Sequence, residues 1–153
     1  MLETPHVVVG AAIATKIVNP FLAIPIAFGS HFLLERVPHW NPHLNTEFKK
    51  YGSITKTSTQ IVIGDVVLSL VLGGFMASRA LPDTGHAALI LICCFAAVLP
   101  DVIEGPHFFL HVKSKLIDKW ITLHKSLQAD TDPIPGLLTQ FITIAAAFAW
   151  VLR

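Results

Sequence analysis

The chain has 153 residues, of which 53% are hydrophobic and only 14% are charged, and its net charge is +1. A soluble domain carries about 25% charged residues, so this chain has too few to cover a water-exposed surface. The apolar content excludes intrinsic disorder, and the near-neutral charge gives no electrostatic basis for binding nucleic acid. Length predicts one domain, residues 1–153, and composition predicts an integral membrane protein.

The first apolar stretch, residues 5–34, is predicted to form a hairpin of two short helices, 5–18 and 20–36. One continuous helix would overshoot a single membrane crossing at 1.5 Å per residue. The Asn19-Pro20 pair is a turn signal, and proline is favoured at the first position of a new helix. Because the first arm is short for a crossing, the hairpin is expected to be tilted or re-entrant.

Three further spans are predicted at residues 58–80, 85–100 and 135–152. Between the last two, residues 107–128 show apolar side chains at helical spacing and a basic polar face, which predicts an amphipathic helix in the membrane interface. A helix packed on a soluble subdomain is the alternative interpretation. The expected fold is an all-α polytopic membrane bundle of about five membrane helices, the first two forming the short hairpin, plus one interfacial helix.

The basic residues predict the orientation of this bundle. Eight of the Lys and Arg residues fall on one side of the predicted spans and three, including Arg153, on the other. Cytoplasmic loops carry the excess of Lys and Arg, so the first side, with the N-terminus, is predicted to face the cytoplasm from the cytoplasmic (inner) membrane.

Most titratable side chains in or near the spans fall at this cytoplasmic end. Asp65 is the strongest functional candidate, because its apolar segment offers no Lys or Arg to neutralise it and such residues are usually functional. It shares one helical stripe with Ser58, Ser69 and Gly73. The alternative interpretation is close helix packing by small residues, with the aspartate hydrogen-bonded between helices.

Histidines form the second group of candidates. His31 and Glu35 share a helix face at spacing i, i+4 and can supply either two metal ligands or one ligand and a proton-transfer group. The antiparallel hairpin arms would bring His6 to the same depth as His31. Asp101 ends a span, where a ligand role and a solvated helix terminus are both open; for Glu104 the solvated terminus is favoured.

Three other histidines are given less weight. His39 and His43 bracket a turn-rich stretch and are expected to be exposed, and His86 is expected to be structural.

Four short motifs resemble those of bacterial and archaeal membrane-bound metal-dependent hydrolase-like proteins, a group linked to the zinc-dependent phospholipase C fold. In chain order they are TPH-x-x-x-G, SHFLLERVPHW, LPD and LHKS. The resemblance implies a buried metal site near the membrane face. The residues that match its motifs are His6, His31, Glu35, His39, Asp101 and His124.

The leading hypothesis is therefore a membrane-embedded hydrolase of phosphoesters or acyl esters that uses a divalent metal and acts on a membrane phospholipid or phosphorylated lipid. The predicted metal ligands are His6, His31, Asp65 and Asp101, with Glu35 as general base and His124 as proton donor or further ligand. Mixed histidine and carboxylate ligands suit zinc, with iron or manganese as alternatives.

Two other classes of function stay open. The first is a non-catalytic metal-binding or proton-coupled transport or assembly protein. The second is a structural membrane protein, which predicts that His6, His31, Asp65 and Asp101 do not converge.

Overall fold

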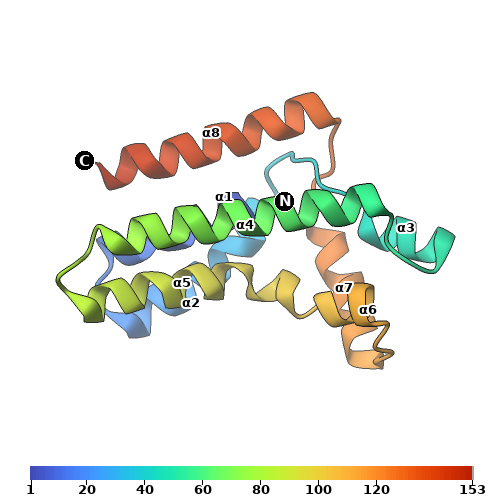
Figure 1. Cartoon of the computed structure of the whole chain (residues 1–153), viewed down its shortest axis with the longest axis horizontal. Coiled ribbons are helices and arrows are strands. Elements are labelled where there is room, and N and C mark those ends of the chain that lie inside the picture. Colours follow the sequence, from blue (N-terminus) through green and yellow to red (C-terminus); the bar gives the residue numbers. More distant parts are fainter. Residues whose placement is uncertain (153) are drawn as a thin grey trace.

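The computed structural model describes residues 1–152, and over that range the chain forms a bundle of eight helices (Figure 1). Arg153 lies outside the described residues. The predicted all-α class is confirmed. The helices are α1 Glu3–Lys16, α2 Pro20–Leu34, α3 Leu44–Tyr51, α4 Lys56–Ser78, α5 Thr84–Val102, α6 Gly105–Leu110, α7 Lys115–Leu127 and α8 Pro133–Val151.

The first helix is the centre of the bundle. α1 packs against α2, α4, α5 and α8, and most of its residues are buried. Small side chains make this position possible: a Cβ at Gly10 would lie 2.6 Å from the carbonyl oxygen of Cys93 in α5. The backbones of α1 and α5 therefore approach closely only because residue 10 is glycine.

Helix starts follow local signals in the sequence. Asn19 caps α2 by accepting a hydrogen bond from the backbone N–H of Phe21, and Pro20 is the first helical residue. Asp83 caps α5 in the same way through the N–H of His86, 2.9 Å away. The predicted break of the N-terminal stretch at Asn19-Pro20 is confirmed, because a capping side chain and a proline at N1 both favour a new helix there.

The prediction of about five membrane helices is wrong in number. Within residues 1–152, three helices are long and apolar enough to cross a membrane, namely α4, α5 and α8. α1 has 14 residues and α2 has 15, which correspond to roughly 21–23 Å against a hydrocarbon core of about 30 Å. The N-terminal hairpin is thus shorter than a full crossing.

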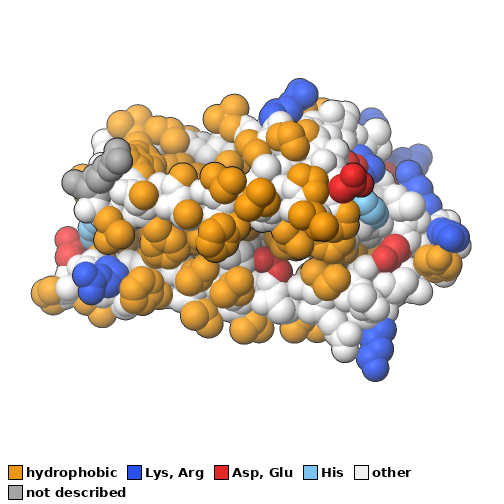
Figure 2. Space-filling model, turned by 90° about the horizontal axis from the view of Figure 1, so that it is seen from above, with side chains coloured by type: hydrophobic (Ala, Val, Ile, Leu, Met, Phe, Trp, Pro, Cys, Tyr) orange, Lys and Arg blue, Asp and Glu red, His pale blue; other side chains and the backbone are white. Residues whose placement is uncertain are grey.

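Large apolar side chains cover the outside of the bundle. Figure 2 shows hydrophobic side chains over most of one face, with most of the visible Lys and Arg at the end formed by α3, α6 and α7. Leu70 on α4, Phe95 on α5 and Phe141 on α8 are each more than half exposed. Apolar surface of this extent is typical of a protein embedded in lipid or bound to a partner, so the structure is compatible with a membrane protein.

The predicted interfacial helix 107–128 is two helices, α6 and α7. His111 has φ 55°, in the left-handed region, and ends α6. Ser114 is extended and precedes α7. Apolar residues keep their helical spacing across residues 111–114, so the sequence pattern gives no sign that the helix is broken there.

A short helix that the sequence pattern did not predict, α3, is joined to the start of α4 by one carboxylate. Glu47 accepts hydrogen bonds from the backbone N–H of Thr55 at 2.9 Å and from the Ser58 hydroxyl at 2.6 Å. Burial acts to raise the pKa of Glu47, but these hydrogen bonds lower it by more, so its pKa lies below the ordinary value.

This lowered pKa predicts an acid-sensitive contribution to stability. A carboxylate whose pKa is lower in the folded state stabilises the fold above its unfolded pKa of about 4.3, and that contribution is lost as the pH falls through the folded pKa. Between about pH 6 and 3, the melting temperature in detergent should fall more for the parent than for Glu47→Gln. Parallel pH profiles for the two proteins would contradict this role.

Candidate metal centre

Histidines and carboxylates from four helices and from the turns after α2 and α5 meet at one end of the bundle. Three overlapping groups can each hold a metal ion, with ligand atoms within 4.8 Å of one another. We call their members the histidine–carboxylate cluster: His6, His31, Glu35, Asp101, Glu104 and His124. Five of the six predicted site residues lie in this cluster, and the sixth, Asp65, does not belong to any of the three groups.

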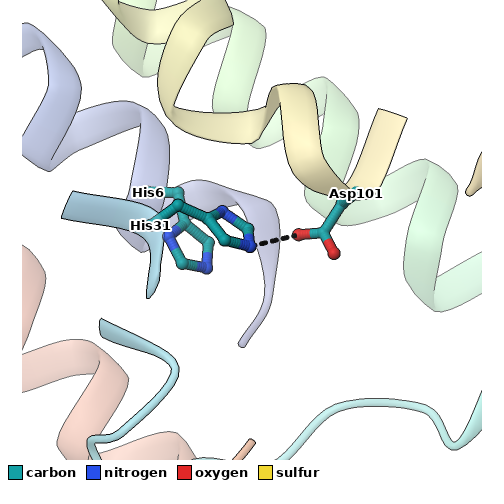
Figure 3. A group of neighbouring side chains, drawn as sticks. All are labelled: His6, His31 and Asp101. Carbon is teal, nitrogen blue, oxygen red and sulfur yellow. Dashed lines mark ion pairs between the residues drawn. The ribbon is translucent and has the colours of Figure 1, made fainter. Parts of the chain in front are cut away.

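The hairpin aligns His6 and His31 as the sequence predicted. Their rings are stacked with centroids 4.1 Å apart. Figure 3 shows both rings beside Asp101, whose Oδ2 is 3.7 Å from His31 Nε2. His6 is on α1, His31 on α2 and Asp101 on α5, so antiparallel packing places three potential ligands at one depth.

Hydrogen bonds determine which nitrogen of each ring faces the cluster. His31 Nδ1 lies 2.8 Å from the Ala97 carbonyl, and His124 Nδ1 lies 2.8 Å from Glu104 Oε1. His39 Nδ1 lies 2.8 Å from the Val37 carbonyl. Because these oxygens only accept, each Nδ1 carries the proton, and each Nε2 is left free to accept a proton or a metal ion. Outer hydrogen bonds of this kind orient metal-binding histidines in proteins.

Two of these nitrogens face each other directly. His31 Nε2 and His124 Nε2 are 2.9 Å apart. Two nitrogen lone pairs at this distance repel each other unless a cation lies between them. A proton on His124 or a metal ion bound by both nitrogens would remove this repulsion.

Glu35 lies among the histidine nitrogens and is fully buried. Its Oε1 accepts from His6 Nε2 at 3.3 Å and pairs with the Met1 amine, and its Oε2 is 3.7 Å from His39 Nε2. Burial alone would raise the pKa of Glu35, but the His6 hydrogen bond and the Met1 amine lower it by more. The result is a carboxylate that stays ionised. A weak proton acceptor of this kind fits a ligand or charge-balancing role better than that of the predicted general base.

His124 combines with Glu104 into a pair suited to proton transfer. Burial acts to lower the pKa of His124, but the Glu104 hydrogen bond and the charge of Asp101 raise it above the ordinary value. The raised pKa favours the predicted role of proton donor, and membership in two of the three ligand groups fits the predicted alternative of a further ligand.

Several buried ligand-type atoms in this region have no hydrogen-bond partner. They are His6 Nδ1, Glu35 Oε2, His39 Nε2 and Asp101 Oδ2. Buried polar atoms are almost always satisfied, so these four atoms would gain a partner from a bound ion or ordered water. Nitrogen and oxygen donors in this mixture fit a divalent transition metal such as zinc, iron or manganese.

Asp65 has a different environment from the one expected of a ligand. Its Oδ2 accepts from the N–H of Glu3 at 2.5 Å, and its Oδ1 accepts from the Thr4 hydroxyl at 2.5 Å and the Thr4 N–H at 3.2 Å. Leu2, at the N-cap of α1, offers no capping side chain, so an aspartate from α4 caps α1 instead. A carboxylate at a helix N-terminus is favourable. These contacts fit the alternative interpretation, in which the aspartate is hydrogen-bonded between helices.

The predicted stripe on α4 is confirmed by burial. Ser58, Asp65, Ser69 and Gly73 are all buried, and the Ser69 hydroxyl lies 3.1 Å from that of Thr4.

A loop after α2 brings His39 to the cluster. The N–H of His39 donates to the Ala129 carbonyl at 3.0 Å, and its own carbonyl accepts from Thr131 at 3.0 Å. α8 holds this loop from outside, since a Cβ at Gly136 would lie 2.4 Å from the backbone nitrogen of Trp40.

Sequence reasoning gave two of these residues the wrong surroundings. His39 is fully buried, although its turn-rich context favoured exposure. Glu104 hydrogen-bonds His124, although a solvated helix terminus was favoured. His39 is four residues after Glu35 and Glu104 is three after Asp101, and this local spacing was the available signal. His86 is structural as expected, with Nε2 3.0 Å from the Ala14 carbonyl.

The cluster opens into a cavity of about 600 Å³. Asp101, Glu104 and His124 of the cluster line it, apolar residues of α4 and α5 line much of the remainder, and Glu3, Asn41, Asp65 and Gln128 add polar groups. The histidine–carboxylate cluster is thus accessible from one side to a ligand several times the size of a water molecule.

Family models, curated proteins and solved structures were compared with this chain, and none of them matches it.

Proposed function

We propose that this chain is a membrane-embedded, metal-dependent hydrolase that cleaves a phosphorylated lipid at the cytoplasmic face of the inner membrane. One observation carries the proposal: buried histidines and carboxylates converge at one end of the bundle, and three of them, Asp101, Glu104 and His124, line a ligand-sized cavity. A structural membrane protein would have no reason to gather costly, unsatisfied groups beside open space.

In this proposal His6, His31 and Asp101 hold the metal, and Glu35 balances its charge. A divalent ion held there would polarise a phosphoryl oxygen and make a water molecule more acidic. Asp65 is left out of the ligand set because its carboxylate caps α1.

His124 is the proton donor to the leaving group. It lines the cavity, and Glu104 fixes its orientation through Nδ1 at 2.8 Å. Donation from a positioned imidazole typically contributes 10²–10⁴-fold to the rate.

The distribution of basic residues supports the cytoplasmic assignment of the site. Eight Lys and Arg lie at the end of the bundle that holds the cluster, whereas Lys16 and Arg79 lie at the other end of the described chain. The eight are Arg36, Lys49, Lys50, Lys56, Lys113, Lys115, Lys119 and Lys125. An excess of this kind marks the cytoplasmic side.

Metal analysis with an activity assay tests this function. The purified protein in detergent should contain about one equivalent of a divalent metal and should release phosphate or a phosphorylated headgroup from phosphatidic acid or a phospholipid. Chelation should abolish hydrolysis, and readdition of zinc, iron or manganese should restore it. His124→Gln should retain the metal and lose at least about a hundredfold in kcat.

Other outcomes would separate the alternatives. Bound metal without hydrolysis of any phosphorylated lipid would favour a metal-binding or transport protein. A protein that binds no metal under any of these conditions would contradict the metal centre itself.

A further inference from the structure

The apolar part of the cavity is a groove between two membrane-length helices. One wall is formed on α4 by Val62, Val66, Leu70 and Gly74, and the other on α5 by Leu91, Phe95, Val98 and Val102. Positions four or three residues apart lie on one helix face, so each wall is a continuous ridge. Val7 of α1 also lines the cavity, as do the polar residues Glu3, Asp65 and Ser69. We call this region the α4–α5 groove.

The groove is open and apolar where a soluble protein would bury such side chains. Leu70 is 71% exposed and Phe95 is 56% exposed, although both line the cavity. Twelve residues of α4 separate Val62 from Gly74, which corresponds to roughly 18 Å along the helix. One leaflet is about half of a 30 Å hydrocarbon core, so the groove has the length of a single acyl chain.

The polar end of the groove holds one lysine together with the carboxylates Glu3, Asp101 and Glu104, so a phosphorylated headgroup bound there needs the proposed metal ion to balance its charge. Lys125 lines the cavity together with His124, and its ammonium lies 3.3 Å from Asp130 near the surface. Asp101 and His124 of the cluster lie at the same end. A phosphate placed there would meet a lysine and the metal site, while its acyl chain would run toward the membrane midplane.

We propose that the α4–α5 groove binds one acyl chain of a phospholipid drawn sideways from the cytoplasmic leaflet, so that the phosphate lies at the histidine–carboxylate cluster. This inference rests on the proposed function for the headgroup and names its substrate class: a membrane-resident lipid phosphoester and not a water-soluble phosphate. The groove selects lipids over water-soluble phosphates, because burial of each methylene of the acyl chain makes the free energy of binding more favourable.

Gly74 offers a means of blocking the groove without disturbing the bundle. A Cβ at Gly74 would meet no atom within 4 Å, and the residue lines the cavity. Gly64, also on α4 and exposed, has equally open space around its Cβ position but does not line the cavity. Gly64→Phe is therefore a matched control for Gly74→Phe.

Photo-crosslinking tests the groove independently of hydrolysis. Phosphatidic acid with a diazirine in one acyl chain is incorporated with each full-length protein into phosphatidylcholine vesicles and irradiated. Saturable labelling of α4 and α5 peptides is expected in the parent and in Gly64→Phe, and about tenfold weaker labelling in Gly74→Phe, which corresponds to lost burial of about two methylenes. Excess unlabelled phosphatidic acid should compete, and glycerol phosphate should not.

The outcomes distinguish this inference from the proposed function. Equal labelling of all three proteins, or labelling that no lipid competes away, would overturn the groove. Competition by glycerol phosphate as strong as that by phosphatidic acid would overturn the acyl-chain specificity. A parent that hydrolyses no lipid but shows the expected labelling would contradict the hydrolase and leave the lipid site standing. Thermal unfolding and the metal content of each variant serve as checks of folding.

Discussion

Replacing His31 by alanine is expected to weaken metal binding by at least about a hundredfold. His31 belongs to two of the three ligand groups, and its Nε2 faces both Asp101 and His124. Loss of an outer hydrogen-bond partner alone typically costs 10–100-fold in affinity, and loss of a ligand costs more. Metal content of the purified protein, measured by mass spectrometry, and competition with a chelator check this result.

His86→Ala is the control for this experiment. His86 also packs against α1, through the Ala14 carbonyl, but lies outside the metal-binding groups of the described chain. This variant should keep its metal even if it melts earlier. Undiminished metal content in His31→Ala, with binding that depends on other residues, would contradict the proposed ligand set.

Replacing Asp65 by asparagine is expected to destabilise the fold by about 3 kcal/mol while the metal stays bound to the folded protein. The carboxylate accepts hydrogen bonds from two backbone N–H groups and one hydroxyl of α1. An amide offers one acceptor and directs N–H donors at the others, leaving buried donors of α1 unsatisfied. Thermal unfolding in detergent and metal analysis of the same samples measure both effects.

Ser78→Ala is the matched control on the same helix. The Ser78 hydroxyl bonds the Phe75 carbonyl of its own helix and is exposed, so its loss should change stability by less than about 0.5 kcal/mol. An Asp65→Asn protein of parental stability that has lost its metal would reverse the conclusion and make Asp65 the ligand that the sequence predicted.

Much of the secondary structure was predictable because its signals are local. Asn19-Pro20 marked the start of α2, and apolar runs marked α4, α5 and α8 to within about two residues. The number of helices long and apolar enough to cross a membrane was not predictable in the same way. A short helix such as α1 can be completely enclosed by others, and apolar composition does not distinguish contact with lipid from contact with protein.

The candidate site was likewise predictable where its signals are local and not predictable where contacts are distant in the chain. His6 and His31 were predicted at one depth because a hairpin relates their distances from the turn, and their stacked rings bear this out. The surroundings of Asp65, His39 and Glu104 were not predictable, since each is defined by a partner distant in the chain. Asp65 contacts residues 61 and 62 positions away, and Glu104 bonds a histidine 20 residues later.

By itself, the sequence determined that this is a helical, apolar chain whose ionisable residues gather at one end. Those properties follow from composition and helical periodicity, which depend only on residues close together in the sequence. Only the tertiary structure decided which of those residues form the cluster and which cap a helix. A carboxylate in an apolar helix must find donors somewhere, and whether they belong to a backbone terminus or to a metal site depends on the helix packed against it.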